Sequence, residues 1–148
     1  GVFMFQVICS WPWSTIWAAV SAIFTAATAG VAWWAMRVWR QQEALKAKMA
    51  LKMAVAEYSN ALSQLPVNLA SPQIRIEKRP EVRDLRIKLN AVMNSFLVCE
   101  HMLERYPRVV SCCRSLPETH KEYVMGRDNN IQVKYICHLL LSQPFVFK

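Results

Sequence analysis

The chain has 148 residues, of which 54% are hydrophobic and 19% charged, and its formal net charge is +8 at pH 7. This length is enough for one membrane anchor and one small domain. Only three glycines occur and strand-like alternation is scarce, which disfavours a β-sheet fold and glycine-rich phosphate loops. We therefore expect an all-α protein.

The segment on which the rest of the chain depends is residues 16–36, a run of 21 residues without a charge. As a helix rising about 1.5 Å per residue it would be roughly 32 Å long, the thickness of a bilayer's hydrocarbon core. Its polar groups are Ser21, Thr25 and Thr28, whose hydroxyls can bond back to the preceding helical turn. We predict a single transmembrane helix. The alternatives are a buried helix of a soluble protein and a signal peptide cleaved near residues 27–29.

Aromatic and basic residues bracket this segment. Indole rings favour the headgroup level of a bilayer. The six tryptophans gather at the two ends of the segment, at Trp11, Trp13, Trp17, Trp33, Trp34 and Trp39. No Lys or Arg precedes Arg37, whereas residues 37–52 contain five, beginning with Arg37 and Arg40. The positive-inside rule then predicts an external N-terminus and a cytoplasmic C-terminal domain. Because this layout is common among small bacterial single-pass proteins, we expect a bacterial inner membrane.

Small residues recur every four positions within the span, at Ala18, Ala22, Ala26 and Gly30. Such a ridge lets two helix backbones approach closely and gain contacts that lipid tails make poorly. We expect it to mediate self-association or docking on another membrane helix. The alternative is that an alanine-rich span carries small residues on every face.

Three regions follow from this layout: a short tail over residues 1–12, the transmembrane helix over 13–39 and a helical cytoplasmic domain over 40–148. Within the domain, proline positions and apolar periodicity predict two long helices, a connecting loop and two shorter helices. The expected long helices cover residues 40–65 and 81–106, the loop 66–80, and the shorter helices 117–125 and 129–142. Residues 108–116 are expected to form at most one helical turn.

Each long helix carries an apolar seam with alternating spacings of three and four, as in coiled coils. The first seam is Ala44, Ala47, Leu51, Ala54, Tyr58, Ala61 and Leu65, and the second is Val82, Leu85, Leu89, Val92, Phe96, Cys99, Leu103 and Tyr106. Two seams joined by a loop predict an antiparallel hairpin with Leu89 and Phe96 in its core. A parallel homo-oligomer is the competing arrangement. For residues 131–137 a β-strand is the alternative to a helix.

A basic cluster surrounds the start of the second long helix. Its members are Arg75, Lys78, Arg79, Arg83, Arg86 and Lys88. We expect these side chains to contact anionic lipid headgroups or an acidic partner protein. The alternative is a solvated helical face on which they pair locally with Glu77, Glu81 and Asp84.

No pattern in the sequence indicates catalysis, a cofactor or a metal site. The thiol and imidazole side chains are Cys99, His101, Cys112, Cys113, His120, Cys137 and His138, and their spacing matches no zinc motif. The five cysteines are an odd number and include no C-x-x-C, so reduced thiols are expected. Redox activity of the adjacent Cys112 and Cys113 stays open.

We therefore expect a membrane-anchored helical protein that acts through protein–protein association, without enzymatic activity. Its expected partners are the lipid bilayer and a second copy or another membrane protein. Nucleic acid is disfavoured because no nucleic-acid-binding motif occurs. The alternative function is a toxin or defence effector that depolarises the membrane, which a tryptophan-rich, alanine-rich span with a basic flank would also suit.

Overall fold

The structure is a computed structural model that describes residues 12–146, and it is 83% helical, with no strand among those residues. This confirms the expected all-α fold. The helices in chain order are α2 (Trp13–Ser63), α3 (Pro72–Glu77), α4 (Arg79–Cys99), the 3-10 helix η1 (Glu100–Leu103), α5 (Pro107–Val124) and α6 (Ile131–Ser142). The chain divides into two compact units, residues 1–42 and 43–148.

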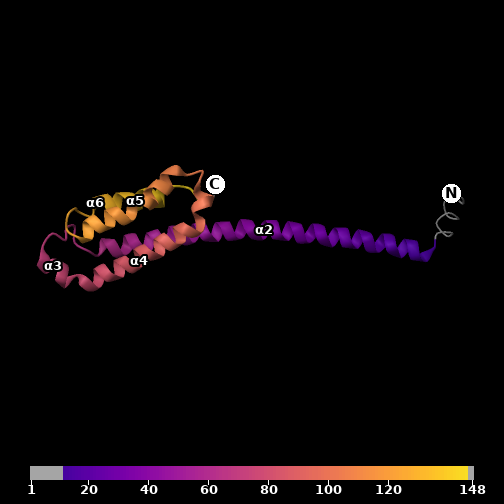
Figure 1. Ribbon diagram of the computed structural model, residues 1–148, viewed down its shortest axis with the longest axis horizontal. Coiled ribbons are helices and arrows are strands. Elements are labelled where there is room, and N and C mark those ends of the chain that lie inside the picture. The colour runs from indigo at the N-terminus through magenta and orange to yellow at the C-terminus, as the bar shows by residue number, and fades with distance from the viewer. Residues whose placement is uncertain (1–11, 147–148) are drawn as a thin grey trace. The chain divides into compact units, whose positions relative to one another are not determined.

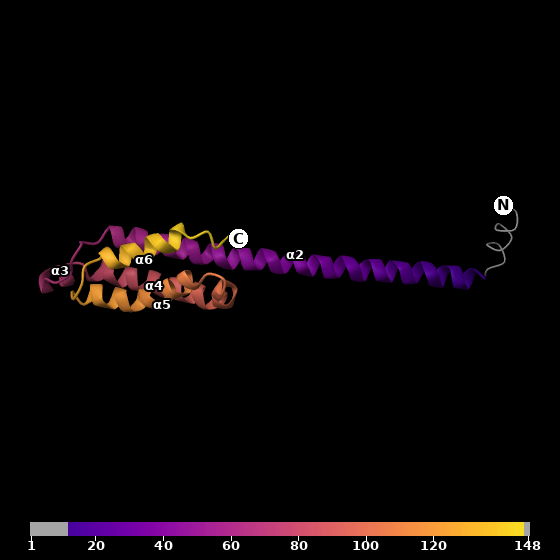
Figure 2. The same cartoon turned by 90° about the horizontal axis from the view of Figure 1, so that it is seen from above.

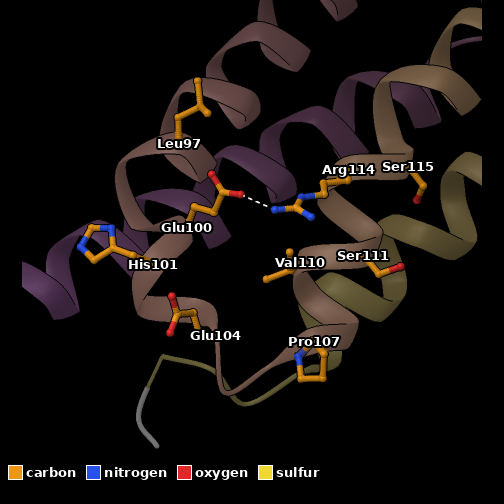
Figure 3. A pocket seen from close by; sticks show the side chains of 9 residues that line it. All are labelled: Leu97, Glu100, His101, Glu104, Pro107, Val110, Ser111, Arg114 and Ser115. Atoms are coloured by element: carbon orange, nitrogen blue, oxygen red, sulfur yellow. Dashed lines mark hydrogen bonds and ion pairs between the residues drawn. The ribbon is translucent and has the colours of Figure 1, made fainter.

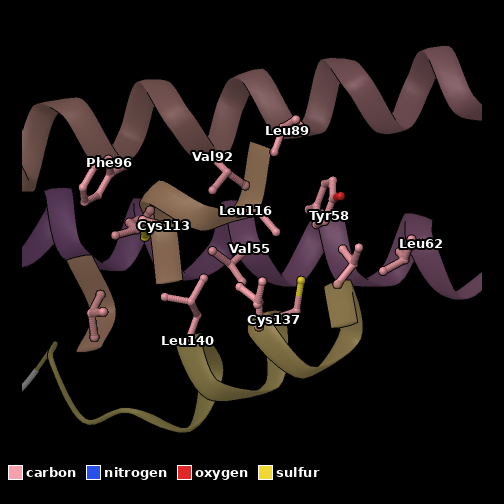
Figure 4. Close-up of a cluster of buried hydrophobic side chains, with 14 of the residues drawn as sticks. Val55, Tyr58, Leu62, Leu89, Val92, Phe96, Cys113, Leu116, Cys137 and Leu140 are labelled. Carbon is pink, nitrogen blue, oxygen red and sulfur yellow. The ribbon is translucent and has the colours of Figure 1, made fainter. Parts of the chain in front are cut away.

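The second unit is a four-helix bundle built from the C-terminal part of α2 together with α4, α5 and α6 (Figures 1 and 2). Successive helices run in opposite directions, which is the arrangement that short connections favour. Their apolar rows meet in one core (Figure 4), which includes Leu51, Val55, Tyr58, Leu62, Leu85, Leu89, Val92, Phe96, Cys113, Leu116, Val133, Ile136, Cys137 and Leu140. The predicted core positions Leu89 and Phe96 are confirmed. Of the seam predicted in the first long helix, Leu51, Tyr58 and Leu65 are buried within the chain, as in the hairpin arrangement, and the alanines are partly buried.

The expected loop over residues 66–80 is partly helical. It contains α3, which begins at Pro72, and α4 already starts at Arg79. Both helices carry proline in the first turn, where the backbone N–H has no helical partner and its absence costs nothing. α4 ends at Cys99 rather than at residue 106, because the chain tightens into η1 before Pro107.

The connector is anchored to the far end of α5. The Tyr123 hydroxyl donates to the Pro66 carbonyl at 2.6 Å, and the Asn130 N–H donates to the Val67 carbonyl at 3.0 Å. Gly126 follows α5 with φ +76°, and a Cβ there would lie 2.6 Å from the Leu69 oxygen. Glycine is therefore required both by the left-handed backbone and by the close approach of the connector.

Residues 117–124 are helical, as predicted, but the expected interruption over residues 108–116 is wrong. Pro107 does not end a helix but begins α5, which continues through Pro117 to Val124. An interior proline costs about 3 kcal/mol because it removes a backbone hydrogen bond. Here it is offset by a buried row with spacings of four and three, at Val109, Cys113, Leu116, His120 and Tyr123. Tertiary burial thus keeps α5 continuous where local signals predicted a break.

Residues 131–142 form the helix α6, so the strand alternative is wrong. Of its two apolar rows, Val133, Ile136 and Leu140 are buried, whereas Ile131 and Tyr135 are exposed. After α6 the chain folds back onto the bundle: Phe145 and Val146 are buried, and the Lys52 ammonium lies 5.7 Å from the centre of the Phe145 ring.

Candidate membrane-spanning segment and bundle surface

One helix among the described residues, α2, is long and apolar enough to cross a membrane, and its apolar window is not buried by the protein. Large side chains such as Ile23, Phe24 and Val31 are 65–70% exposed. A core helix of a soluble protein would bury such residues. The hydroxyls of Thr25 and Thr28 donate to the carbonyls four residues earlier, both at 2.8 Å, as predicted. The apolar part of α2 is therefore surrounded on every side by an exposed, mainly apolar surface.

Tryptophans lie at both ends of the apolar stretch, all of them exposed. Trp13 and Trp17 are at one end and Trp33, Trp34 and Trp39 at the other. Trp17 and Trp33 are separated by roughly 24 Å, and Trp13 and Trp39 by roughly 39 Å, at the usual helical rise. These spacings bracket the bilayer's hydrocarbon core of about 30 Å. Trp11, also predicted to be an interfacial anchor, lies outside the described residues.

The predicted association ridge is open. Ala18, Ala22, Ala26 and Gly30 are exposed, and a Cβ built on Gly30 would meet nothing within 4 Å. Successive members are rotated by about 40° around the helix, so the ridge winds slowly across one side. Within the described residues 12–146 no atom beyond the adjoining helix turns comes within 4 Å of that Cβ, and the role of the ridge in association stays a prediction.

The residues of the predicted basic cluster do not all lie on the same side of the bundle. Arg79, Arg83 and Arg86 share one side of α4, whereas Lys88 falls about 180° from Arg79 around the helix. Arg75 is occupied by a structural contact, because its guanidinium donates to the Met125 carbonyl at 3.1 Å. The sixth member, Lys78, forms an ion pair with Glu81 at 3.8 Å. The six residues therefore do not form one common surface.

An open groove of about 880 Å³ lies between the end of α4 and the start of α5 (Figure 3). Glu100 and Arg114 face each other across it at 2.6 Å, and Glu104 and His101 line its other end. Both partners of the ion pair are exposed enough for water to screen it, so it is worth at most about 1 kcal/mol. The sequence offered no signal for this groove, because it depends on the turn between the two helices.

A buried polar pair inside the bundle was also missed by sequence reasoning. The Tyr58 hydroxyl lies 2.7 Å from Nδ1 of His120, and both residues are buried. Burial lowers the pKa of His120 to about 4, and the neighbouring charge of Arg86 acts in the same direction. The imidazole is therefore neutral near pH 7, and it shares one hydrogen bond with the Tyr58 hydroxyl, whose direction depends on the tautomer of the ring. Burial also raises the pKa of Tyr58 well above its usual value.

The described cysteines are free thiols, and burial makes them poor nucleophiles. Cys99, Cys113 and Cys137 are buried and Cys112 is partly buried. Burial raises the pKa of Cys113 and of Cys137 to about 12, and it also raises that of Cys112. Within residues 12–146, no group of three or more His, Cys, Asp or Glu side chains is arranged to hold a metal ion. Cys9 lies outside that range.

Comparisons with protein families, with characterised proteins and with solved structures find no match to this chain. The fold and its surfaces therefore define only a class: an all-α protein with one helix able to cross a membrane and a four-helix bundle.

Proposed function

We propose that this chain is a single-pass membrane protein whose helical bundle acts through protein–protein association. The observation that supports it most directly is the apolar part of α2, which the protein leaves unburied and which tryptophans bracket. An exposed apolar surface of this extent is costly in water at about 25 cal/mol per Å². In a bilayer the same surface meets lipid, and a helix satisfies its own backbone hydrogen bonds.

The proposed orientation has an external N-terminus and a cytoplasmic bundle. Its support is the charge distribution, since residues 1–36 contain no Lys or Arg while Arg37 and Arg40 follow the apolar stretch directly. Positive residues beside a span are retained on the cytoplasmic side. We extend this to a bacterial inner membrane as the expected location.

The proposed mode of action is association rather than chemistry. Two surfaces support it: the open small-residue ridge in α2 and the exposed apolar side chains of α4, at Ile87, Leu97 and Val98. Ile87 and Val98 lie on the side opposite the buried row, where a solvated helix would carry polar groups, and Leu97 lies beside the groove. The expected partners are a second copy of the chain or another membrane protein.

Membrane insertion is tested by alkaline carbonate extraction of cells that express the full chain. The wild type should remain in the membrane pellet. A Phe24→Arg, Ala26→Arg variant should be released, because each arginine near the centre of a span costs about 2.5–3.5 kcal/mol. Its matched control, Gln41→Arg with Gln42→Arg, adds the same charge beyond the apolar stretch and should stay in the pellet. Release of the wild type would contradict the proposal.

Association is tested by crosslinking the full chain in membranes. Ala22→Leu with Gly30→Leu should reduce the crosslinked dimer, whereas Ala19→Leu with Ala27→Leu, which changes residues off the ridge, should not. An unchanged dimer in the ridge variant would remove the ridge from the mechanism. Collapse of the membrane potential on induced expression would instead favour the alternative of a depolarising effector.

A further inference from the structure

The end of the apolar part of α2 carries a small notch built from aromatic and basic side chains. It has a volume of about 430 Å³ and is lined by Trp33, Met36, Arg37, Arg40 and Gln41. These five residues lie within about 140° of one side of the helix, so their side chains point in similar directions. All of them belong to the first unit.

The two arginines of the notch are in no ion pair among the described residues. Residues 1–42 contain no Asp or Glu, and Glu43, one helical turn after Arg40, forms none of the ion pairs found there. The guanidinium carbon of Arg37 lies 5.8 Å from the centre of the Trp33 ring, a cation–π distance that orients the side chain. Arg40 follows one helical turn later on the same side.

We propose that this notch binds the phosphate of an anionic phospholipid headgroup. The guanidinium fork matches phosphate oxygens and can bind them with two parallel hydrogen bonds. Trp33 and Met36 supply apolar surface at the level where the glycerol and upper acyl chain of the same lipid would lie. Charge complementarity thus favours an anionic lipid over a zwitterionic one, whose cationic group the two arginines would repel.

The inference rests on the proposed membrane insertion and adds to it a defined lipid ligand. The probe is spin-labelled phosphatidylglycerol, compared with spin-labelled phosphatidylcholine, on the full chain in phosphatidylcholine vesicles. The measurement is the relative association constant of the two lipids at the protein surface. We expect phosphatidylglycerol to be preferred, and we expect a loss of about fivefold for each arginine changed to glutamine, since one basic residue near the surface contributes about 1 kcal/mol.

Three comparisons make the test decisive. Arg37→Gln with Arg40→Gln should lose the preference, whereas Arg105→Gln with Arg108→Gln, which removes two exposed charges from the bundle, should keep it. Arg37→Lys with Arg40→Lys keeps the charge but not the fork, so it should show an intermediate preference. Equal lipid preference in the wild type and the Arg37→Gln, Arg40→Gln variant would overturn the proposal.

Free glycerol phosphate distinguishes a lipid from a soluble phosphate ligand. It should not displace the spin-labelled lipid at millimolar concentration, because it lacks the acyl chains that hold the lipid at the notch. Displacement would overturn the assignment to a lipid. Carbonate extraction of the same variants separates the two proposals: chains that stay in the pellet but show no lipid preference contradict only this inference, whereas release of the wild type contradicts the membrane anchor itself.

Discussion

Acid should destabilise the bundle through His120, and the size of the effect follows from its surroundings. The imidazole is buried against Tyr58, which lowers its pKa to about 4, while an unfolded histidine has a pKa near 6.5. Between these values the unfolded chain binds a proton that the folded chain does not. Stability is therefore greatest above pH 6.5 and falls as the pH decreases toward 4.

The full difference corresponds to about 3 kcal/mol, and most of it should already be lost at pH 4.5. Protonation would also place a charged imidazolium in the buried site beside the Tyr58 hydroxyl. All six tryptophans precede residue 40, so their fluorescence does not report on the bundle. The suitable assay is urea unfolding of the full chain in detergent micelles, followed by circular dichroism at pH 7 and pH 4.5.

The matched variants are His120→Gln, which removes the titrating group, and His101→Gln with His138→Gln, which removes two exposed imidazoles. Carboxylates also titrate in this range, but they contribute equally to every variant. His120→Gln should therefore lose about 2–3 kcal/mol less stability than the wild type between the two pH values. The reasoning is refuted if the wild type and His120→Gln lose equal stability.

Three further outcomes are expected. Gly126→Ala should lower the free energy of unfolding by at least about 1–2 kcal/mol in the same assay, because φ is +76° and a backbone oxygen would lie 2.6 Å from the new Cβ. The control is Gly30→Ala, whose new Cβ meets no atom within 4 Å and which should leave the stability of the bundle unchanged. Leu85→Ala should cost about 2–5 kcal/mol, since the side chain is fully buried, and a loss below about 1 kcal/mol would contradict its core position. Maleimide should label Cys113 far more slowly than Cys112 in the folded chain, because burial raises the pKa of Cys113 to about 12. Equal labelling rates under native conditions would show that α5 is not packed as described.

Local patterns in the sequence were sufficient where a single helix decides the outcome. Charge-free length identified the apolar part of α2, and spacings of three and four identified the buried face of α4 and η1, from Leu85 to Leu103. These features repeat along one helix, so no knowledge of a neighbouring element is needed. The side-chain hydrogen bonds of Thr25 and Thr28 were predictable for the same reason.

Contacts between distant segments decided what the sequence left open or predicted wrongly. Pro117 lies inside α5 because the row from Val109 to Tyr123 is buried by other helices. Residues 131–142 form the helix α6 rather than a strand, and this helix too carries a buried row. Arg75 is drawn out of the basic cluster by its hydrogen bond to the carbonyl of Met125, which directly follows α5. His120 gained its partner Tyr58 from a helix 62 positions earlier in the chain. Helical periodicity is a property of neighbouring residues and is therefore written in the sequence, whereas burial and hydrogen-bond partners depend on which faces meet and arise only in the folded bundle.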